Sequence, residues 1–295
     1  MSDAHLAAAD LVVAIGSTLT ISHYTSQIPA GPKIIQIVRD PRDLSQSYPV
    51  SFLVSGDLQL VMEQLALAAE SEKRSGEMRE SPAAKLVARQ KDAFMKQWGA
   101  RLVSDQEPIS PYRVIGDLLR VADRSKTVVT HDSGNPRDQI VPFFEAVTAF
   151  GYIGWGKSTP LGSGLGLALG AKLAKPEWLS VNFMGDSSFG MSGMDIETGV
   201  RCGIPVLTVV FNNGRMGGYT RHHPVATRTH GIHLQSGNYS KVAAALGAVS
   251  ERVESAKEVA PALERAIKST KDGKSAVIEV MTREEAEFPH IRTYG

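Results

Sequence analysis

The stretch LSVNFMGDSSFG, residues 179–190, decides the fold of this chain when it is taken with IPVLTVVFNNG, residues 204–214. Each begins with a short apolar run of the kind that forms a buried strand, and residues 193–202 between them have the pattern of a helix. In a right-handed β-α-β unit the carboxyl ends of both strands open onto the same edge of the sheet. We therefore expect Asp186 and Asn213, which follow the two strands, to lie at one edge.

That edge is suited to a metal ion bound to a diphosphate. A carboxylate from Asp186 and an amide oxygen from Asn213 are hard oxygen ligands, which Mg²⁺ prefers, and Mg²⁺ completes its shell with phosphate and water. Ser187, Ser188 and the backbone N–H groups around Gly190 can donate to phosphate. The alternative is an ordinary turn, in which the Asp caps a helix and Asn-Asn-Gly only reverses the chain. The spacing, the element order and the flanking residues together favour the metal site.

The arrangement resembles the fingerprint of thiamine diphosphate-dependent enzymes of the acetolactate synthase-like superfamily, in which Gly-Asp-Gly is followed after about thirty residues by Asn-Asn. Ser187 departs from that pattern at its third position. Gly-Asp-Ser followed by Phe-Gly, Ser-Gly-Met and Glu-Thr is similar to the oxalyl-CoA decarboxylase and 2-hydroxyacyl-CoA lyase branch. The resemblance runs from about Ala9 to Val280 and implies thiamine diphosphate and Mg²⁺ as cofactors.

The resemblance also implies a set of site residues. The expected cofactor-binding residues are Asn135, Thr159, Leu161, Gly185, Asp186, Ser187, Ser188 and Asn213. The expected metal ligands are Asp186, Asn213 and Arg215. The candidates for a catalytic role are His131, Tyr219, His222 and His223.

Leu161 stands 25 positions before Asp186, where the family has a large apolar side chain that wedges between the two cofactor rings and holds them in a V shape. By the same resemblance, the backbone carbonyl of Thr159 accepts from the 4′-amine, and the backbone N–H of Leu161 serves the pyrimidine ring. Without the metal motif at the right distance, Leu161 would be interpreted as a plain core residue.

The catalytic candidates come from two segments. His131 and Asn135 belong to the loop at the carboxyl end of the expected strand 126–130, and Asn135 aligns with an Asn of the acyl-CoA branch. Tyr219 falls where decarboxylases of the wider superfamily place an active-site acid, and His222 and His223 follow it. For each of them, lining the pocket without transferring a proton is the alternative role.

The expected fold class is α/β. Residues 1–69 are predicted to be the second half of a Rossmann-like middle domain, with strands at 10–16, 33–38 and 51–54 and a helix after Asp57. Residues 70–108 are predicted to be a linker and a helix. Residues 109–295 are predicted to form the diphosphate-binding domain, a doubly wound parallel sheet. Its remaining expected elements are helices at 111–121, 239–246 and 256–270 and a final strand at 275–280.

Composition limits the class and the compartment. The chain has 295 residues and a formal net charge of +1 with interspersed acids and bases, which argues against a nucleic-acid or membrane surface. Its single cysteine, Cys202, excludes an internal disulfide and is expected to be a buried helix residue. No signal peptide and no apolar run long enough to span a membrane is apparent. We expect a cytoplasmic protein.

The resemblance implies that the pyrimidine-binding domain of the enzyme lies outside this chain. Related enzymes carry an activating glutamate on a pyrimidine-binding domain, and no glutamate of this chain precedes the diphosphate domain in that context. We therefore expect a separate pyrimidine-domain subunit that carries this glutamate, most simply in an (αβ)2 complex, although a truncated gene product is the alternative. The three parallel strands expected within residues 10–60 would also form a thin sheet with an open edge that needs strands from elsewhere.

The expected activity is cleavage or formation of a C–C bond next to a carbonyl, of the 2-hydroxyacyl-CoA lyase type, with a small-molecule or acyl-CoA substrate. An acetolactate synthase-like transferase subunit and a non-catalytic, cofactor-binding regulatory half-enzyme are the alternatives. An unrelated nucleotide-binding protein is disfavoured because GSGLGLALG, residues 162–170, does not match G-x-G-x-x-G. Arg39 and Arg42 are candidates for nucleotide phosphates, with a solvated turn as the alternative, and Val38 replaces an acid common in the family.

Overall fold

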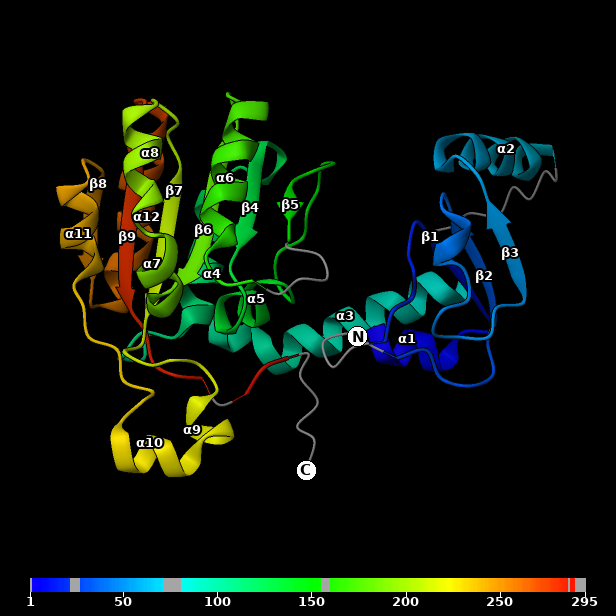
Figure 1. The fold of residues 1–295 in the computed structure, drawn as a ribbon, viewed down its shortest axis with the longest axis horizontal. Coiled ribbons are helices and arrows are strands. Elements are labelled where there is room, and N and C mark those ends of the chain that lie inside the picture. The colour runs from blue at the N-terminus through cyan, green and yellow to red at the C-terminus, as the bar shows by residue number, and fades with distance from the viewer. Residues whose placement is uncertain (1, 22–26, 72–80, 155–159, 286, 290–295) are drawn as a thin grey trace. The chain divides into compact units, whose positions relative to one another are not determined.

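The computed structural model describes residues 2–21, 27–71, 81–154, 160–285 and 287–289. It confirms the α/β class, because parallel sheets alternate with helices along the chain (Figure 1). The chain forms two compact units, Met1–Gln97 and Trp98–Gly295.

The first unit is built on a three-stranded parallel sheet in the order β1-β2-β3. Its strands are β1 (Leu11–Ile15), β2 (Lys33–Val38) and β3 (Phe52–Ser55). The central strand carries the buried side chains Ile34, Ile37 and Val38, whereas both outer strands are largely exposed. Its helices are α1 (Ser2–Ala8), α2 (Leu58–Ser71) and most of α3 (Pro82–Trp98).

The second unit contains a six-stranded parallel sheet in the order β5-β4-β6-β7-β9-β8. The strands are β4 (Thr127–His131), β5 (Tyr152–Ile153), β6 (Leu179–Gly185), β7 (Leu207–Asn212), β8 (Val249–Val253) and β9 (Ala276–Met281). The two edge strands, β5 and β8, were not predicted from the sequence. The chain moves from β4 to one side for β5 and to the other side for β6, so a topological switch point lies between β4 and β6.

Helices cover both faces of this sheet (Figure 1). On one face, α6 (Ser163–Ala174), α8 (Asp195–Arg201) and α11 (Tyr239–Ala245) pack on a core cluster that includes Leu165, Ile196 and Val210. On the other face lie α4 (Pro111–Val121) and α12 (Val259–Lys271), which contact each other. The remaining α-helices are α5 (Asn135–Ile140), α7 (Asp186–Ser192), α9 (Tyr219–His222) and α10 (Pro224–His230). Short 3-10 helices occupy Pro41–Asp43, Gly99–Val103, Arg124–Lys126 and Ala256–Glu258.

The burial of Cys202 and the character of the helices were both predicted from the sequence. The prediction that Cys202 is buried is wrong: it is exposed just after α8, because that helix buries Ile196 and Gly199 and ends before Cys202. None of the helices within the described ranges combines the length and the apolar character that a bilayer crossing requires.

Candidate functional site

The metal candidate Asp186 lies where β6 passes into α7. Its neighbour Gly185 is paired with Phe211 of β7, so the carboxyl ends of the two strands lie side by side. Asp186 is 3% exposed, and its carboxylate Oδ1 accepts from the backbone N–H of Ser187 over 2.8 Å. Burial raises the pKa of this carboxyl, opposed by N–H groups of Ser187, Arg215 and Gly214. The site therefore holds a poorly solvated acid that a cation would stabilise.

Asn213 meets Asp186 at a single backbone group. The N–H of Arg215 donates to Oδ2 of Asp186 over 3.2 Å and to Oδ1 of Asn213 over 3.0 Å. The side chain of Arg215 turns to Glu284, with Nε 3.6 Å from Oε2. The loop after β7 thus brings an amide oxygen and a carboxylate oxygen to one point.

A buried carboxylate supports this loop, a role that was not predicted from the sequence. Glu279 of β9 is fully buried, and it accepts from Asn212 Nδ2 over 2.7 Å and from the N–H of Ser240 over 2.9 Å. Oδ1 of Asn212 in turn accepts from the N–H of Gly214 over 3.0 Å, where φ is +68°. The signal was available, because Glu279 is the lone acid in the apolar strand 275–280.

Leu161 lies in the turn before α6 and is 38% exposed. Its position is set by two neighbours. A Cβ at Gly162 would lie 3.3 Å from Cβ of Ser192, so the turn packs on the end of α7. The N–H of Gly164 donates to Oδ1 of Asp132 over 2.9 Å, which ties the start of α6 to the end of β4. Burial raises the pKa of Asp132. The role of Asp132 in anchoring this turn was not predicted from the sequence. Thr159 lies outside the described residues.

Asn135 begins α5 and reaches the segment after β7. A Cβ at Gly217 would lie 3.1 Å from Oδ1 of Asn135, and a Cβ at Gly185 would lie 3.9 Å from Cγ of Pro136. The first turn of α5 therefore lies beside both the end of β6 and the loop that follows Asn213. Ser187 and Ser188 occupy the first turn of α7, where Ser187 is half-buried and Ser188 is buried.

His131 ends β4 and is 2% exposed. Its Nδ1 is 3.1 Å from the carbonyl oxygen of Asp132, which can only accept, so Nδ1 carries the proton. Nε2 is then the acceptor for the hydroxyl of Tyr152 on β5. Burial lowers the pKa of His131 and raises that of Tyr152. In this arrangement His131 is a neutral, buried side chain that links β4 to β5.

Tyr219, His222 and His223 lie apart from these groups, on an excursion of the chain between β7 and α11. Backbone bonds from Gln235 to Gly214 (2.8 Å) and from Met216 to His233 (2.7 Å) close its base. Its helices α9 and α10 lie beyond the carboxyl ends of the strands (Figure 1). Tyr219 is half-buried and stacks edge-on with His223 at 5.1 Å between ring centroids, whereas both histidines are exposed.

The residues present fit a Mg²⁺ ion that keeps few protein ligands. Among the described residues, no group of three or more His, Cys, Asp or Glu side chains could hold a metal ion. A site made of one carboxylate and one amide oxygen is not of that type, and Mg²⁺ takes its other oxygens from phosphate and water. The buried, desolvated Asp186 beside the oxygen of Asn213 provides such a pair.

Comparisons with known proteins show the family of the chain. The family model described as "Thiamine pyrophosphate enzyme, C-terminal TPP binding domain" matches residues 132–280. The acetolactate synthase large subunit of Mycobacterium tuberculosis is 33% identical over 82% of this chain and 42% of its own length. Sulfoacetaldehyde acetyltransferase of Alcaligenes xylosoxydans xylosoxydans is 28% identical over 97% of this chain and 52% of its own length. A 2-hydroxyacyl-CoA lyase of Oryza sativa subsp. japonica is 34% identical over 42% of this chain and 22% of its own length.

A solved structure shares the fold. The thiamine diphosphate-dependent 4-hydroxybenzoylformate decarboxylase of Rhodococcus jostii RHA1 superposes with a TM-score of 0.72 at 19% identity, covering 94% of this chain and 50% of that one. The chain spans about half the length of the relatives that it matches over most of its own length. The matched segment begins at Asp132, ends at Val280 and contains Asp186, Asn213 and Glu279. The chain therefore belongs to the thiamine pyrophosphate enzyme family, and residues 132–280 are its C-terminal cofactor-binding domain.

Proposed function

We propose that the second unit binds thiamine diphosphate through a Mg²⁺ ion held by Asp186, Asn213 and Arg215. The observation that carries this proposal is the convergence of Asp186 Oδ2 and Asn213 Oδ1 on the N–H of Arg215. Since a guanidinium has no acceptor atom, Arg215 would contribute its main-chain carbonyl oxygen. Ser187 and Ser188 at the start of α7 would donate to the diphosphate.

Bound thiamine diphosphate supplies an electron sink for an acyl carbanion, which permits a C–C bond next to a carbonyl to break or form. Leu161 would press on the rings from the turn before α6, and Asp132 would hold that turn in place through Gly164. His131 would act as a positioning residue, because both of its ring nitrogens are engaged. Tyr219, His222 and His223 would reach substrate only if the excursion folds back over the strand ends.

We favour a 2-hydroxyacyl-CoA lyase type of reaction. Its support is the Gly-Asp-Ser motif at residues 185–187 and the rice relative, which is 34% identical over 131 residues. An acetolactate synthase-like transferase is the second candidate, supported by a relative that matches over 244 residues at 33% identity. The two candidates are distinguished by offering the assembled enzyme a 2-hydroxyacyl thioester and a 2-oxo acid together. Consumption of the thioester supports the lyase, and consumption of the 2-oxo acid supports the transferase.

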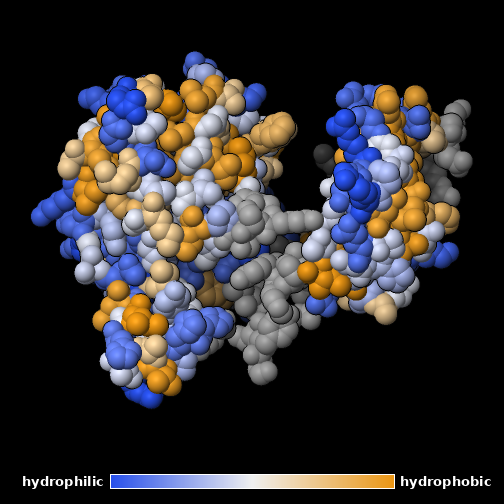
Figure 2. Space-filling view, in the orientation of Figure 1, coloured by the Kyte–Doolittle hydropathy of each residue, from blue (hydrophilic) through white to orange (hydrophobic). Residues whose placement is uncertain are grey.

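We also propose that the activating glutamate comes from a partner polypeptide that covers the first unit, in an (αβ)2 complex. Leu11, Val13 and Ile15 of β1 are each more than 40% exposed, as are Phe52 and Leu53 of β3. Figure 2 shows hydrophobic residues gathered at the surface of this unit. Such a surface fits a large, apolar interface, above about 2,000 Å².

The test is to purify the chain alone and titrate it with thiamine diphosphate with and without Mg²⁺ by calorimetry. Mg²⁺-dependent binding that disappears in Asp186→Ala supports the cofactor site, and binding that is unaffected by Asp186→Ala overturns it. The lone chain should show no turnover of a 2-oxo or 2-hydroxyacyl substrate. Robust turnover by the lone, monomeric chain would overturn the split arrangement. Cofactor binding in a reconstituted complex without turnover would favour a regulatory half-enzyme.

A further inference from the structure

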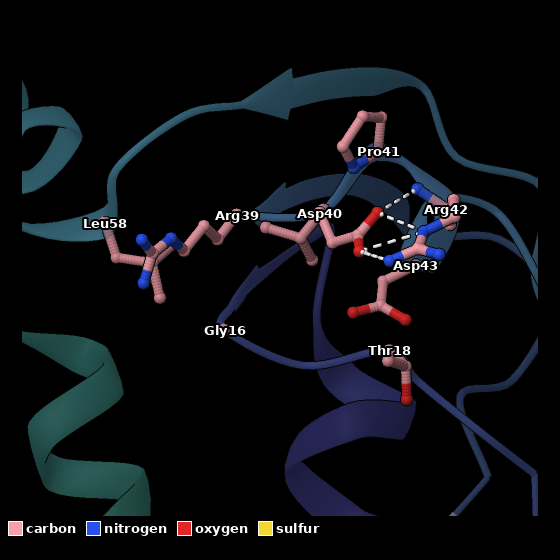
Figure 3. A pocket seen from close by; sticks show the side chains of 9 residues that line it. Gly16, Thr18, Arg39, Asp40, Pro41, Arg42, Asp43 and Leu58 are labelled. Carbon is pink, nitrogen blue, oxygen red and sulfur yellow. Dashed lines mark hydrogen bonds and ion pairs between the residues drawn. The ribbon is translucent and has the colours of Figure 1, made fainter.

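Polar side chains bond to one another in both units, and these bonds differ in burial. In the first unit, Arg42 pairs with the carboxylate of Asp40 at the wall of a pocket (Figure 3), and the two side chains are 88% and 38% exposed. Exposed ion pairs contribute little to stability. In the second unit, the hydroxyl of Tyr152 bonds to His131, which is 2% exposed, and the next residue, Asp132, is 0% exposed. Because the loss of a polar partner is costly inside a protein, the buried bonds constrain the backbone more strongly.

Tyr152 begins a continuous network of hydrogen bonds. Burial raises the pKa of Tyr152, so its hydroxyl keeps the proton and donates to Nε2 of His131. Nδ1 of His131 donates to the carbonyl of Asp132 over 3.1 Å. The N–H of the same peptide group, which belongs to Ser133, donates to the carbonyl of Pro160 over 3.4 Å. Because consecutive hydrogen bonds polarise one another, each bond of this network strengthens the next.

The network reaches the backbone on both sides of Leu161. Pro160 precedes Leu161, and three residues after Leu161 the N–H of Gly164 donates to the carboxylate of Asp132 over 2.9 Å. Burial raises the pKa of that carboxyl, and N–H groups at the start of α6 oppose the shift by favouring its charged form. The start of α6 lies so close to β4 that a Cβ at Gly164 would be 2.8 Å from the carbonyl carbon of His131. The end of β4 therefore holds the turn of Leu161 at two points.

A side chain that orients reacting groups must be held to within about 0.5 Å. Leu161 is 38% exposed, so its place depends on the backbone on either side of it. We propose that Tyr152 is a positioning residue for the cofactor rings, which acts through His131 on the turn of Leu161. The hydroxyl donates to the acceptor nitrogen of the neutral imidazole, and the imidazole holds the peptide group between Asp132 and Ser133. The inference rests on the proposed cofactor site and adds to it a residue that acts only through its neighbours.

The variant Tyr152→Phe removes the hydroxyl and keeps the ring. Nε2 of His131 then loses the bond from Tyr152 in a buried place, so the imidazole turns or admits water and its bond to Asp132 weakens. In the full chain without cofactor, hydrogen exchange of the Ser133 and Gly164 amides, followed by NMR, should become about tenfold faster. Unchanged exchange of both amides in Tyr152→Phe would overturn the proposal.

Tyr112→Phe is the matched control. Tyr112 is a buried tyrosine of α4 in the same unit, and its hydroxyl donates to the carbonyl of Glu287 over 3.1 Å. This variant also loses one hydroxyl bond, but it should leave the exchange of the Ser133 and Gly164 amides unchanged. Equal acceleration in Tyr112→Phe and Tyr152→Phe would show a general loosening of the unit and would overturn the specific role of Tyr152.

The assembled enzyme tests the connection to the cofactor rings. Tyr152→Phe should lower kcat about tenfold, whereas KM and the Mg²⁺-dependent affinity for thiamine diphosphate should change by less than about twofold, because the metal still holds the diphosphate. The double variant of Tyr152→Phe and Leu161→Ala should be no slower than Leu161→Ala alone, since both changes act on one wedge. Losses in kcat that multiply in the double variant would show that Tyr152 acts by another route and overturn the proposal.

Failure of the proposed cofactor site gives a different result from failure of this inference. If the unaltered chain does not bind thiamine diphosphate in the presence of Mg²⁺ by calorimetry, the cofactor site and the role of Tyr152 both fail. If the unaltered chain binds it, and Tyr152→Phe matches Tyr112→Phe in amide exchange and in kcat, only the role of Tyr152 fails.

Discussion

The side chains of Asn212 and Glu279 meet across the neighbouring strands β7 and β9, with Asn212 Nδ2 2.7 Å from Glu279 Oε1. Both residues are buried, at 4% and 0% exposure. Because Asn212 Oδ1 also accepts from the N–H of Gly214, this pair fixes the turn that carries Asn213 and Arg215 toward Asp186. Glu279, on the last strand in sequence, thus shapes the candidate metal site at the ends of the earlier strands β6 and β7.

We expect Glu279→Gln to destabilise the protein and to loosen the metal loop. The new amide would place a donor against the donors of Asn212 or Ser240, a loss of about 2 kcal/mol in the free energy of unfolding. Urea denaturation measures this loss, and the apparent Mg²⁺ affinity should fall in parallel. Glu254→Gln is the control, because Glu254 pairs with the same Arg252 but its side chain is 69% exposed. Equal effects of the two variants would contradict the role of Glu279.

Asp186→Ala should abolish Mg²⁺-dependent binding of thiamine diphosphate, and Asn213→Ala should weaken it less, because a neutral amide is the weaker ligand. Neither change should unfold the metal-free chain, since burial raises the pKa of Asp186 and its charged form is costly there. Calorimetric titration and thermal melts measure the two properties. Full cofactor occupancy at low Mg²⁺ in either variant would show that the metal site lies elsewhere.

Leu161→Ala should lower kcat of the assembled enzyme by about tenfold and change cofactor affinity little, because the wedge orients the rings whereas the metal holds the diphosphate. Leu173→Ala is a matched control: it is a 64% exposed leucine of α6, on the helix that Leu161 precedes. Steady-state kinetics with a cofactor titration separate the two parameters. An unchanged kcat in Leu161→Ala would count against the wedge.

His131 should make the stability of the protein depend on pH. Burial lowers its pKa from the value of 6.5 for an unperturbed histidine, so below that value the unfolded chain binds a proton more readily than the folded one. The free energy of unfolding should therefore fall as the pH decreases through 6.5, and it is fully retained above that pH. Urea denaturation at a series of values from about pH 8 to about pH 5 measures this slope. His131→Phe should make the slope shallower, and equal slopes would refute the contribution.

Much of the fold was predictable because local patterns coincide with tertiary burial. The strand expected at 33–38 is β2 and the helix expected at 111–121 is α4, with the same bounds. The edge strand β8 (Val249–Val253) was missed because its sequence, Val-Ser-Glu-Arg-Val, has polar residues at its centre and is stabilised by pairing with β9. The two-residue β5 is too short to have a pattern of its own.

The sequence by itself determined the family, the parallel α/β architecture and the meeting of Asp186 and Asn213, because strand order and handedness bring successive carboxyl ends to one edge. Only the tertiary structure decided that Glu279 supports the loop after β7 and that Asp132 anchors the turn of Leu161. It also decided that His131 is buried against Tyr152 while His222 is exposed. These last relationships depend on contacts between residues that are distant in sequence. Such contacts form because buried polar groups need hydrogen-bond partners, and no local sequence pattern encodes them.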